Sequence, residues 1–383
     1  MNFTSQLAVI LLCSAIGWGW TPFEVSPTTN RQERPSVSGE VVVWQEYVQY
    51  EEQLEWDWDI YGVDLANDPS GLIFVAYMNA DQTRPSIWGT WVTWEDNYYG
   101  DLDVYVSDIT DTENVLRYPV AITEDDYEDD QAFPRVHGNT VVWQHVYVDA
   151  ETQASDWDIR AADITDPNKP LIYTVAGLVG DQQRPDVYRS RIVWQDNYYG
   201  ENDILMADAW RRNAPLLSVV SEFAIEQIQP VTDGKYVVWR EQIDAATDLL
   251  FGADVSNPEH PVEFLISDAP GLKDNPAISA PLVVWQDNRS GVWNLYGYNL
   301  ITGQEFAITD DGWNQTRPAI DGTLVAYEDD RYGNPAIFAV RLDGPLTADC
   351  PAPPAGDVNG DCRVDLTDLA VIAADWLSSA LVY

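Results

Sequence analysis

The chain of 383 residues contains 63 Asp and Glu residues against 20 Lys and Arg residues, which gives a formal net charge of −43 at pH 7. This charge excludes sequence-independent nucleic-acid binding as the default function, because clusters of Lys and Arg are needed to hold the phosphate backbone. It favours solubility and an affinity for divalent cations. The acidic residues are spread through the chain, so they do not indicate a disordered acidic tail.

The N-terminal segment, residues 1–17, is predicted to be a signal peptide. Its apolar core runs from Leu7 to Ile16 and is too short to span a bilayer, and Ala15 and Gly17 offer a cleavage site of small residues. No Lys or Arg precedes this core, so a buried N-terminal strand is the alternative. We expect a bacterial protein that is secreted or held at the cell surface, with no membrane span.

A proline followed nine positions later by an aromatic residue recurs seven times. The pairs are Pro35/Trp44, Pro85/Trp94, Pro134/Trp143, Pro185/Trp194, Pro230/Trp239, Pro276/Trp285 and Pro318/Tyr327. Gln lies three positions before six of these prolines, and Lys273 replaces it before the remaining one. Successive prolines are between 42 and 51 residues apart, as their numbers show. An internal repeat of this length decides the architecture before any other signal does.

Each repeat is predicted to contain four short strands. The first follows the proline, and the second is rich in β-branched residues and ends at the Trp. The third opens with an Asp in several repeats, for example at Asp59 and Asp103, and the fourth is apolar. Four strands with a period in the forties are typical of one blade of a β-propeller.

The two ends of the repeat region complete each other. The last repeat ends one strand short, and the segment Phe23–Ser26 matches the sequence that precedes the seventh proline. We therefore predict an all-β fold, a seven-bladed β-propeller over residues 21–346 that is closed by an N-terminal strand. Closure removes the exposed strand edges that an open ring would carry.

The repeats resemble the TolB-type β-propeller repeat, a branch of the WD-type propellers. The resemblance rests on blades that read QxRPxIxGxxVVWQDxxxGxxDIYxxDL and covers Thr21–Leu342. It implies the propeller fold and says little about function, because propellers host many activities.

An Arg precedes the repeat proline in four repeats, at Arg34, Arg84, Arg184 and Arg317. We expect these arginines to pair with the acidic residues that follow each aromatic residue, namely Asp96, Asp196, Asp287 and Asp329. A ring of arginines that binds an anionic ligand in the central channel is the alternative. The three histidines show no spacing of metal ligands, so metal-dependent chemistry is not expected in the ring.

Two loops with the sequence DNYYG follow the second strands of the second and fourth repeats. Their tyrosines are Tyr98, Tyr99, Tyr198 and Tyr199. Exposed tyrosines beside Asp and Asn could stack on sugar rings and hydrogen-bond to them, so we predict a ligand-binding role. The alternative is that these tyrosines pack on the neighbouring blade.

The C-terminal segment differs in chemistry from the repeats. Residues 347–356 are predicted to be a Pro-rich linker, and residues 357–383 a calcium-binding segment with a short helix. The ligands expected at calcium-loop spacing are Asp357, Asn359, Asp361, Asp365, Asp368 and the backbone carbonyl of Arg363. Cys350 and Cys362 are close in sequence and are expected to form a disulfide in an exported protein.

This segment resembles one repeat of a type I dockerin, whose pattern is DxNxDGxxxxxDLxxL. The match covers Asp357–Leu369, although Cys362 stands where the loop glycine is expected and a second repeat does not follow. The resemblance implies a small α-helical half-dockerin that binds Ca²⁺ and docks onto a cohesin-type module.

Together these features predict an exported, non-catalytic recognition or scaffold protein. Its propeller would bind a polysaccharide or a protein partner but no nucleic acid, and its dockerin-like tail would link it to polysaccharide-degradation assemblies. Two alternatives remain: a dockerin-targeted carbohydrate-active enzyme, either a glycoside hydrolase or a polysaccharide lyase, and a structural cell-surface component. We expect a monomer in each case.

Overall fold

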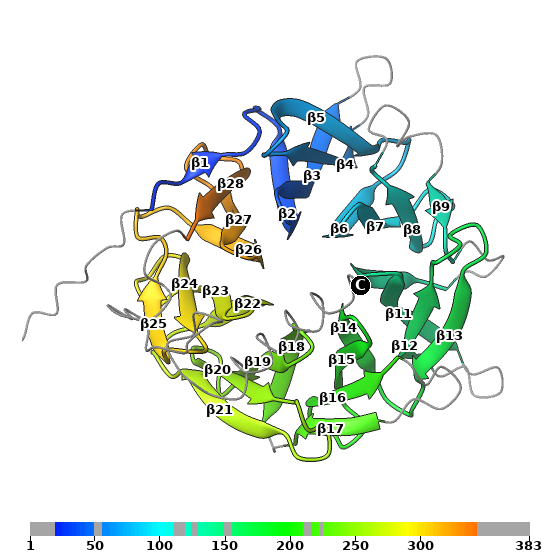
Figure 1. Cartoon of the computed structure of the whole chain (residues 1–383), viewed down its shortest axis with the longest axis vertical. Helices are drawn as coiled ribbons and strands as arrows, with labels where there is room; N and C mark the ends of the chain where they lie inside the picture. The colour runs from blue at the N-terminus through cyan, green and yellow to red at the C-terminus, as the bar shows by residue number, and fades with distance from the viewer. Residues whose placement is uncertain are drawn as a thin grey trace, which may run out of the picture.

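In this computed structural model, seven four-stranded antiparallel sheets surround a central axis (Figure 1). The structure describes residues 20–49, 56–110, 119–123, 129–148, 155–209, 217–222 and 225–342. The predicted seven-bladed β-propeller is therefore confirmed over this part of the chain. Within those ranges, no helix has the length and apolar character needed to cross a membrane.

In the first six blades the strands follow one another along the chain from the axis outwards, and these blades are consecutive in the sequence. Blade 1 contains β2 (Arg31–Ser38), β3 (Val41–Gln49), β4 (Trp56–Asp64) and β5 (Asp68–Ala76). Blade 2 contains β6 (Gln82–Trp88), β7 (Trp91–Asp96), β8 (Asp103–Asp108) and β9 (Val120–Ala121). Blade 3 contains β10 (Gln131–His137), β11 (Thr140–Val148), β12 (Ser155–Asp163) and β13 (Leu171–Ala176). Blade 4 contains β14 (Gln182–Tyr188), β15 (Arg191–Asp196), β16 (Asp203–Asp208) and β17 (Leu217–Ser221).

The remaining three blades complete the ring. Blade 5 contains β18 (Glu226–Thr232), β19 (Tyr236–Gln242), β20 (Asp248–Asp254) and β21 (Val262–Ser267). Blade 6 contains β22 (Lys273–Ser279), β23 (Leu282–Asp287), β24 (Asn294–Asn299) and β25 (Gln304–Ala307). Blade 7 contains β26 (Gln315–Asp321), β27 (Leu324–Asp329) and β28 (Ala336–Arg341), with β1 (Phe23–Glu24) outermost.

The N-terminal strand closes the ring as predicted. Figure 1 shows β1, in blue, beside β28, in orange, although the two strands come from opposite ends of the propeller sequence. Phe23 pairs with Ala339 in an antiparallel register, and the Val25 amide donates a hydrogen bond of 2.8 Å to the carbonyl of Ile337. The ring is thereby held shut by the two ends of one chain.

The aromatic residue that ends the repeat motif forms the core between blades. Six tryptophans and Tyr327 at this position are completely buried. Trp94 of blade 2, for example, packs in one cluster with Val43 and Ile60 of blade 1. Burial of such large rings is the main stabilising contribution of each blade interface.

The acidic residues two positions after the tryptophans have a role that the sequence did not reveal. The indole Nε1–H of Trp194 donates to Asp196 at 3.1 Å, and that of Trp285 donates to Asp287 at 3.2 Å. These carboxylates therefore satisfy buried indole donors, and the expectation that they pair with the arginine before each proline is wrong for these two blades.

Candidate functional site

A β-bulge interrupts every inner strand next to its proline. In blade 2 the register shifts between Thr83 and Ser86, and the six other inner strands shift at the equivalent place. The residue before the proline adopts a left-handed conformation with φ between 47° and 57° in all seven blades. These residues are Arg34, Arg84, Phe133, Arg184, Gln229, Asn275 and Arg317. Each costs on the order of 1 kcal/mol or more, so the surrounding structure must hold it in place.

A hydrogen bond from each bulge to a neighbouring blade supplies that support. The Arg84 amide donates to Gln45 Oε1 at 3.0 Å, and the Phe133 amide donates to Glu95 Oε1 at 2.7 Å. The accepting residue directly follows the buried aromatic residue of the preceding blade. Arg240 occupies that position in blade 5 and cannot accept, so the Asn275 amide donates to Gln229 Oε1 instead, at 3.2 Å.

All seven left-handed residues line a central cavity of about 280 Å³. Five arginines reach it, namely Arg34, Arg84, Arg135, Arg184 and Arg317. The whole chain contains only 20 Lys and Arg residues and has a net charge of −43. The five cavity arginines are a quarter of these cationic residues. The bulges therefore concentrate positive charge on the axis.

Burial makes three of these arginines costly to keep charged. The pKa of Arg34 falls from its usual value to about 10, first because of burial and then because of the nearby Arg84 and Arg317. Burial is also the main cause that lowers the pKa of Arg84 and of Arg184. Bringing like charges together out of water is unfavourable, and an anion in the cavity would relieve that cost.

The pairing of these arginines is uneven around the ring. Arg317 forms an ion pair with Glu328 at 2.8 Å, and Arg84 forms one with Glu95 at 3.2 Å. Among the residues that the structure describes, Arg34 and Arg184 form no ion pair within 4 Å. Arg135 likewise forms no ion pair within 4 Å there, so the guanidinium groups of Arg34, Arg135 and Arg184 are available for an external anion.

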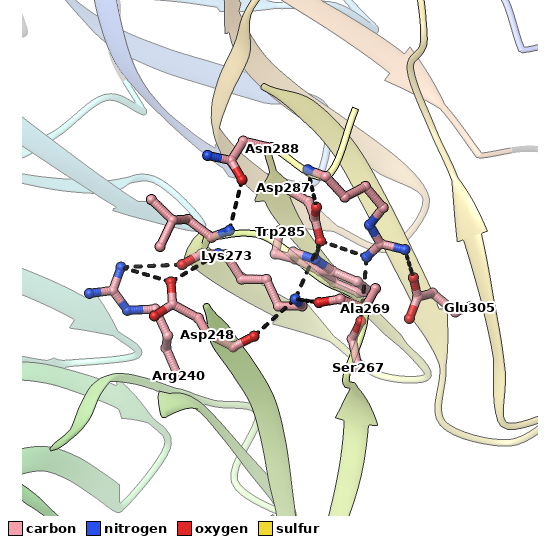
Figure 2. A network of polar contacts seen from close by, with 11 residues as sticks. Arg240, Asp248, Ser267, Ala269, Lys273, Trp285, Asp287, Asn288 and Glu305 are labelled. Atoms are coloured by element: carbon pink, nitrogen blue, oxygen red, sulfur yellow. Dashed lines mark hydrogen bonds and ion pairs between the residues drawn. The ribbon is translucent and has the colours of Figure 1, made fainter. Parts of the chain in front are cut away.

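The wall formed by blades 5 and 6 has a different chemistry. Arg240 is held between Asp248 and Asp274, with nitrogen–oxygen distances of 3.8 and 3.2 Å. Figure 2 shows Arg240 beside Asp248. The bulge residues on this side, Gln229 and Asn275, carry neutral amides. The cationic residues of the cavity thus come from blades 7, 1, 2, 3 and 4, which makes the site asymmetric.

Lys273 is the first residue of the inner strand of blade 6 and connects this strand to blade 5. It replaces the repeat glutamine and is completely buried, and its ammonium donates to the carbonyls of Asp248 at 3.0 Å and Ala269 at 2.5 Å (Figure 2). Burial lowers its pKa, and the carboxylate of Asp287, 3.8 Å away, opposes that change. Lys273 is fully occupied by these partners, so we assign it a structural role.

The four tyrosines predicted to bind a ligand lie in two exposed loops. The exposed fractions are 52% for Tyr98, 60% for Tyr99, 50% for Tyr198 and 66% for Tyr199. Within each loop the two rings meet edge to face, with centroids 5.0 and 4.8 Å apart. The loops belong to blades 2 and 4, and their ligand-binding role remains a prediction.

The sequence pointed to part of this site. It identified Arg34, Arg84, Arg184 and Arg317 but favoured a structural role for them, and it missed Arg135, which follows the proline of blade 3. The motif itself could have revealed the site, since seven equivalent positions in a closed ring must face one axis. Within the described ranges, no three His, Cys, Asp or Glu side chains gather as a metal site.

The predicted calcium ligands lie outside the described residues, and so does the predicted disulfide. These residues are Asp357, Asn359, Asp361, Arg363, Asp365 and Asp368, with Cys350 and Cys362. The boundaries at residues 1–17, 347–356 and 357–383 fall there too and remain predictions.

No protein-family model and no curated protein matches the sequence. Solved structures do match it, and at least one of them is a β-propeller domain. The β-propeller domain of the Trilobed protease from Pyrococcus furiosus has a TM-score of 0.60 and 13% identity over 82% of this chain and 94% of that one. The oligogalacturonate lyase from Vibrio parahaemolyticus has a TM-score of 0.57 and 10% identity over 85% and 94%.

A puromycin-hydrolyzing peptidase from Mycobacterium tuberculosis matches with a TM-score of 0.57 and 14% identity over 80% of this chain. The present chain spans about half the length of that peptidase, 51%. At these identities the likeness shows the fold alone. The prediction of a non-catalytic recognition or scaffold protein is nevertheless wrong on these comparisons, because these three similar structures belong to two peptidases or proteases and an oligogalacturonate lyase.

Proposed function

We propose that this propeller binds the substrate of an enzyme that degrades acidic oligosaccharides, and that the arginine-lined cavity holds the carboxylates of the substrate. The cluster of five arginines on the axis of an otherwise acidic protein carries this proposal. Guanidinium groups bind carboxylates through paired, charge-assisted hydrogen bonds. An oligosaccharide of uronic acids offers one carboxylate per sugar and suits such a cavity.

The comparisons favour a lyase over a peptidase as the reaction. The oligogalacturonate lyase matches this chain over nearly its whole length, whereas the peptidase matches over half of its own length. A lyase must remove a proton next to a carboxylate, and neutralising that carboxylate makes the proton more acidic. The cavity arginines would supply this neutralisation.

Two carboxyls beside the arginines, buried Glu95 and half-buried Asp186, suit proton transfer in such a reaction. Burial raises the pKa of Glu95, which pairs with Arg84, and it also raises the pKa of Asp186, which faces Arg135. A carboxyl with a raised pKa can exchange a proton nearer to neutral pH than an exposed one. We assign these two groups as the first candidates for acid–base catalysis.

The test combines binding and turnover on oligogalacturonate. Titration calorimetry measures binding, and ultraviolet absorbance detects the unsaturated products of a lyase. Arg34→Gln and Arg184→Gln should each weaken binding about tenfold, because each removes an unpaired cation. Lys235→Gln is the matched control, since Lys235 is an exposed cation that pairs with Asp254 outside the cavity. Wild-type binding that these arginine variants leave unchanged, or the absence of any binding, would refute the proposal.

We also propose that the C-terminal segment binds one Ca²⁺ ion. The support is the spacing of oxygen ligands at Asp357, Asn359, Asp361, Asp365 and Asp368. Calcium titration of the full chain should give one tight site that Asp361→Ala abolishes and the propeller variant Asp166→Ala retains. Equal calcium binding by both variants would remove the site from this segment.

Export and docking are separate proposals. The apolar core at Leu7–Ile16 supports removal of residues 1–17 on secretion, and the dockerin resemblance of Asp357–Leu369 supports docking onto a cohesin-type module. The mass of the secreted protein and a calcium-dependent pull-down with an isolated cohesin module test them one at a time.

A further inference from the structure

Phe133 stands out in the ring of left-handed residues. It occupies in blade 3 the position that an arginine holds in blades 1, 2, 4 and 7. The guanidinium of Arg84 lies 4.0 Å from the centroid of its ring, and that of Arg184 lies 4.2 Å away. These arginines come from the blades on either side of blade 3, and both guanidiniums lie over the same phenyl ring.

This stack is held firmly at several points. The backbone of Phe133 is fixed at φ 57° and its amide donates to Glu95 Oε1. Glu95 also pairs with Arg84 and accepts a hydrogen bond from the hydroxyl of Thr83 at 3.2 Å. Stacking of a guanidinium on an aromatic face adds attraction and restricts its motion. The two charged groups therefore keep a fixed separation.

The ring of Phe133 sets that separation. Burial is the main cause that lowers the pKa of Arg84, and the nearby charge of Arg184 lowers it further. Without the phenyl ring they could spread apart or turn toward other partners. With it, both central carbons stay close to one ring, so they are at most about 8 Å apart.

We propose that Arg84, Phe133 and Arg184 form a two-anion site, in which Phe133 is a positioning residue that spaces the guanidiniums for two anionic groups of one ligand. This deepens the function proposed above, on which it rests for the identity of the ligand. The preferred substrate is then an oligosaccharide with at least two carboxylates rather than a single uronic acid. Joining two anions in one ligand makes the second contact intramolecular and raises affinity.

A series of linear α,ω-dicarboxylates, from succinate to sebacate, measures the spacing without requiring turnover. Titration calorimetry at low ionic strength, where such contacts are least screened, should show an affinity optimum at an intermediate or long chain. That optimum should be about tenfold tighter than propionate, which makes one contact only.

Variants test whether the preference for dicarboxylates depends on the stack of Arg84, Phe133 and Arg184. Phe133→Leu should remove the preference for dicarboxylates over propionate, whereas Phe133→Tyr keeps the ring and should keep the preference. Arg184→Gln should remove it too without altering Phe133, which covers the case in which Phe133→Leu does not fold. Dicarboxylates of every length that bind no better than propionate would overturn the proposal, and so would a preference that survives Arg184→Gln or a folded Phe133→Leu. Success with the dicarboxylates and failure with oligogalacturonate would retain this site and reject the proposed substrate.

Discussion

At the scale of single residues, Arg184 and Arg317 occupy equivalent positions and yet have opposite electrostatic environments. Burial is the main influence on both, and it lowers the pKa of Arg184. For Arg317 the charge and hydrogen bond of Glu328, with help from Glu33, outweigh burial and raise the pKa. The charge of Arg184 therefore destabilises the folded protein, whereas the charge of Arg317 stabilises it through its ion pair with Glu328.

Replacing each of these arginines by Gln should separate function from stability. Arg184→Gln should leave the melting temperature unchanged or slightly higher while it weakens anion binding. Arg317→Gln should lower the melting temperature by about 1–3 °C, since Glu328 and Glu33 lose their counter-charge. Scanning calorimetry without ligand measures both, and a larger loss for Arg184→Gln than for Arg317→Gln would contradict this account.

His137 predicts a pH dependence of stability. Burial, followed by the charge of Arg189, lowers its pKa from 6.5 to about 4, and Asp321 opposes this change. Between these two values the unfolded chain binds a proton that the folded chain does not, so the free energy of unfolding falls as the pH falls through this window. The loss is at most about 3 kcal/mol at the acid end.

The variant His137→Asn isolates that contribution. Its side-chain oxygen can still accept the hydrogen bond that the Arg189 amide donates to His137 Nδ1 at 3.0 Å, but it does not titrate. The difference in unfolding free energy between wild type and variant, measured with urea at pH 7 and pH 4.5, should shift in favour of the variant on acidification. A difference that is the same at both pH values would show that His137 does not titrate in this way.

At the scale of elements, closure depends on one very short strand, β1. Val25, directly after it, is buried and donates to the carbonyl of Ile337. Gln32 joins the same seam, accepting from the Ile337 amide at 3.0 Å and donating to the carbonyl of Ser26 at 3.1 Å. The first and last segments of the propeller are thus joined by hydrogen bonds of both backbone and side chains.

Val25→Pro should open this seam. It removes the amide donor and disturbs a buried position, which should lower the free energy of unfolding by about 2–4 kcal/mol. Thr21→Pro, at an exposed position before β1, is the matched control and should have little effect. Urea unfolding followed by tryptophan fluorescence compares them, and equal stability of the two variants would show that β1 contributes little to closure.

Substitutions of the buried Lys273 in blade 6 measure how much its hydrogen bonds contribute to stability. Lys273→Met leaves the carbonyls of Asp248 and Ala269 without their donor and should cost about 2–4 kcal/mol. Lys273→Gln restores the residue of the six other blades and can still donate, so it should cost less than half as much. The same urea assay ranks them, and a Met variant as stable as the Gln variant would mean that the ammonium contacts are not stabilising.

At the scale of the whole molecule, charge decides the response to salt. The net charge of −43 means that the acidic side chains repel one another in the folded protein. At 0.1 M, salt largely screens the repulsion between exposed charges that are more than about 10 Å apart. The melting temperature should therefore rise by several degrees as sodium chloride increases to about 0.15 M. Tetramethylammonium chloride should act equally, because screening does not depend on the cation, and a flat or falling curve with either salt would contradict this explanation.

The sequence by itself determined the architecture. The spacing from proline to aromatic residue fixed the number of blades, and the match between Phe23–Ser26 and the missing last strand fixed the closure. Both follow from local rules, since strand length, turn residues and alternation of side chains act over a few residues. Every blade solves the same local problem, so the repeat could be recognised without any tertiary contact.

Only the tertiary structure decided the site. Arg34 and Arg184 are far apart in the chain, and their side chains meet on one axis only because seven left-handed bulges turn inwards when the ring closes. Sequence neighbours suggested the wrong carboxylates, because Asp196 and Asp287 bind indoles while Glu95 and Glu328 reach the arginines. Burial, and with it the pKa of each arginine, depends on what surrounds a side chain in space, and that surrounding exists only after the first and last blades have joined.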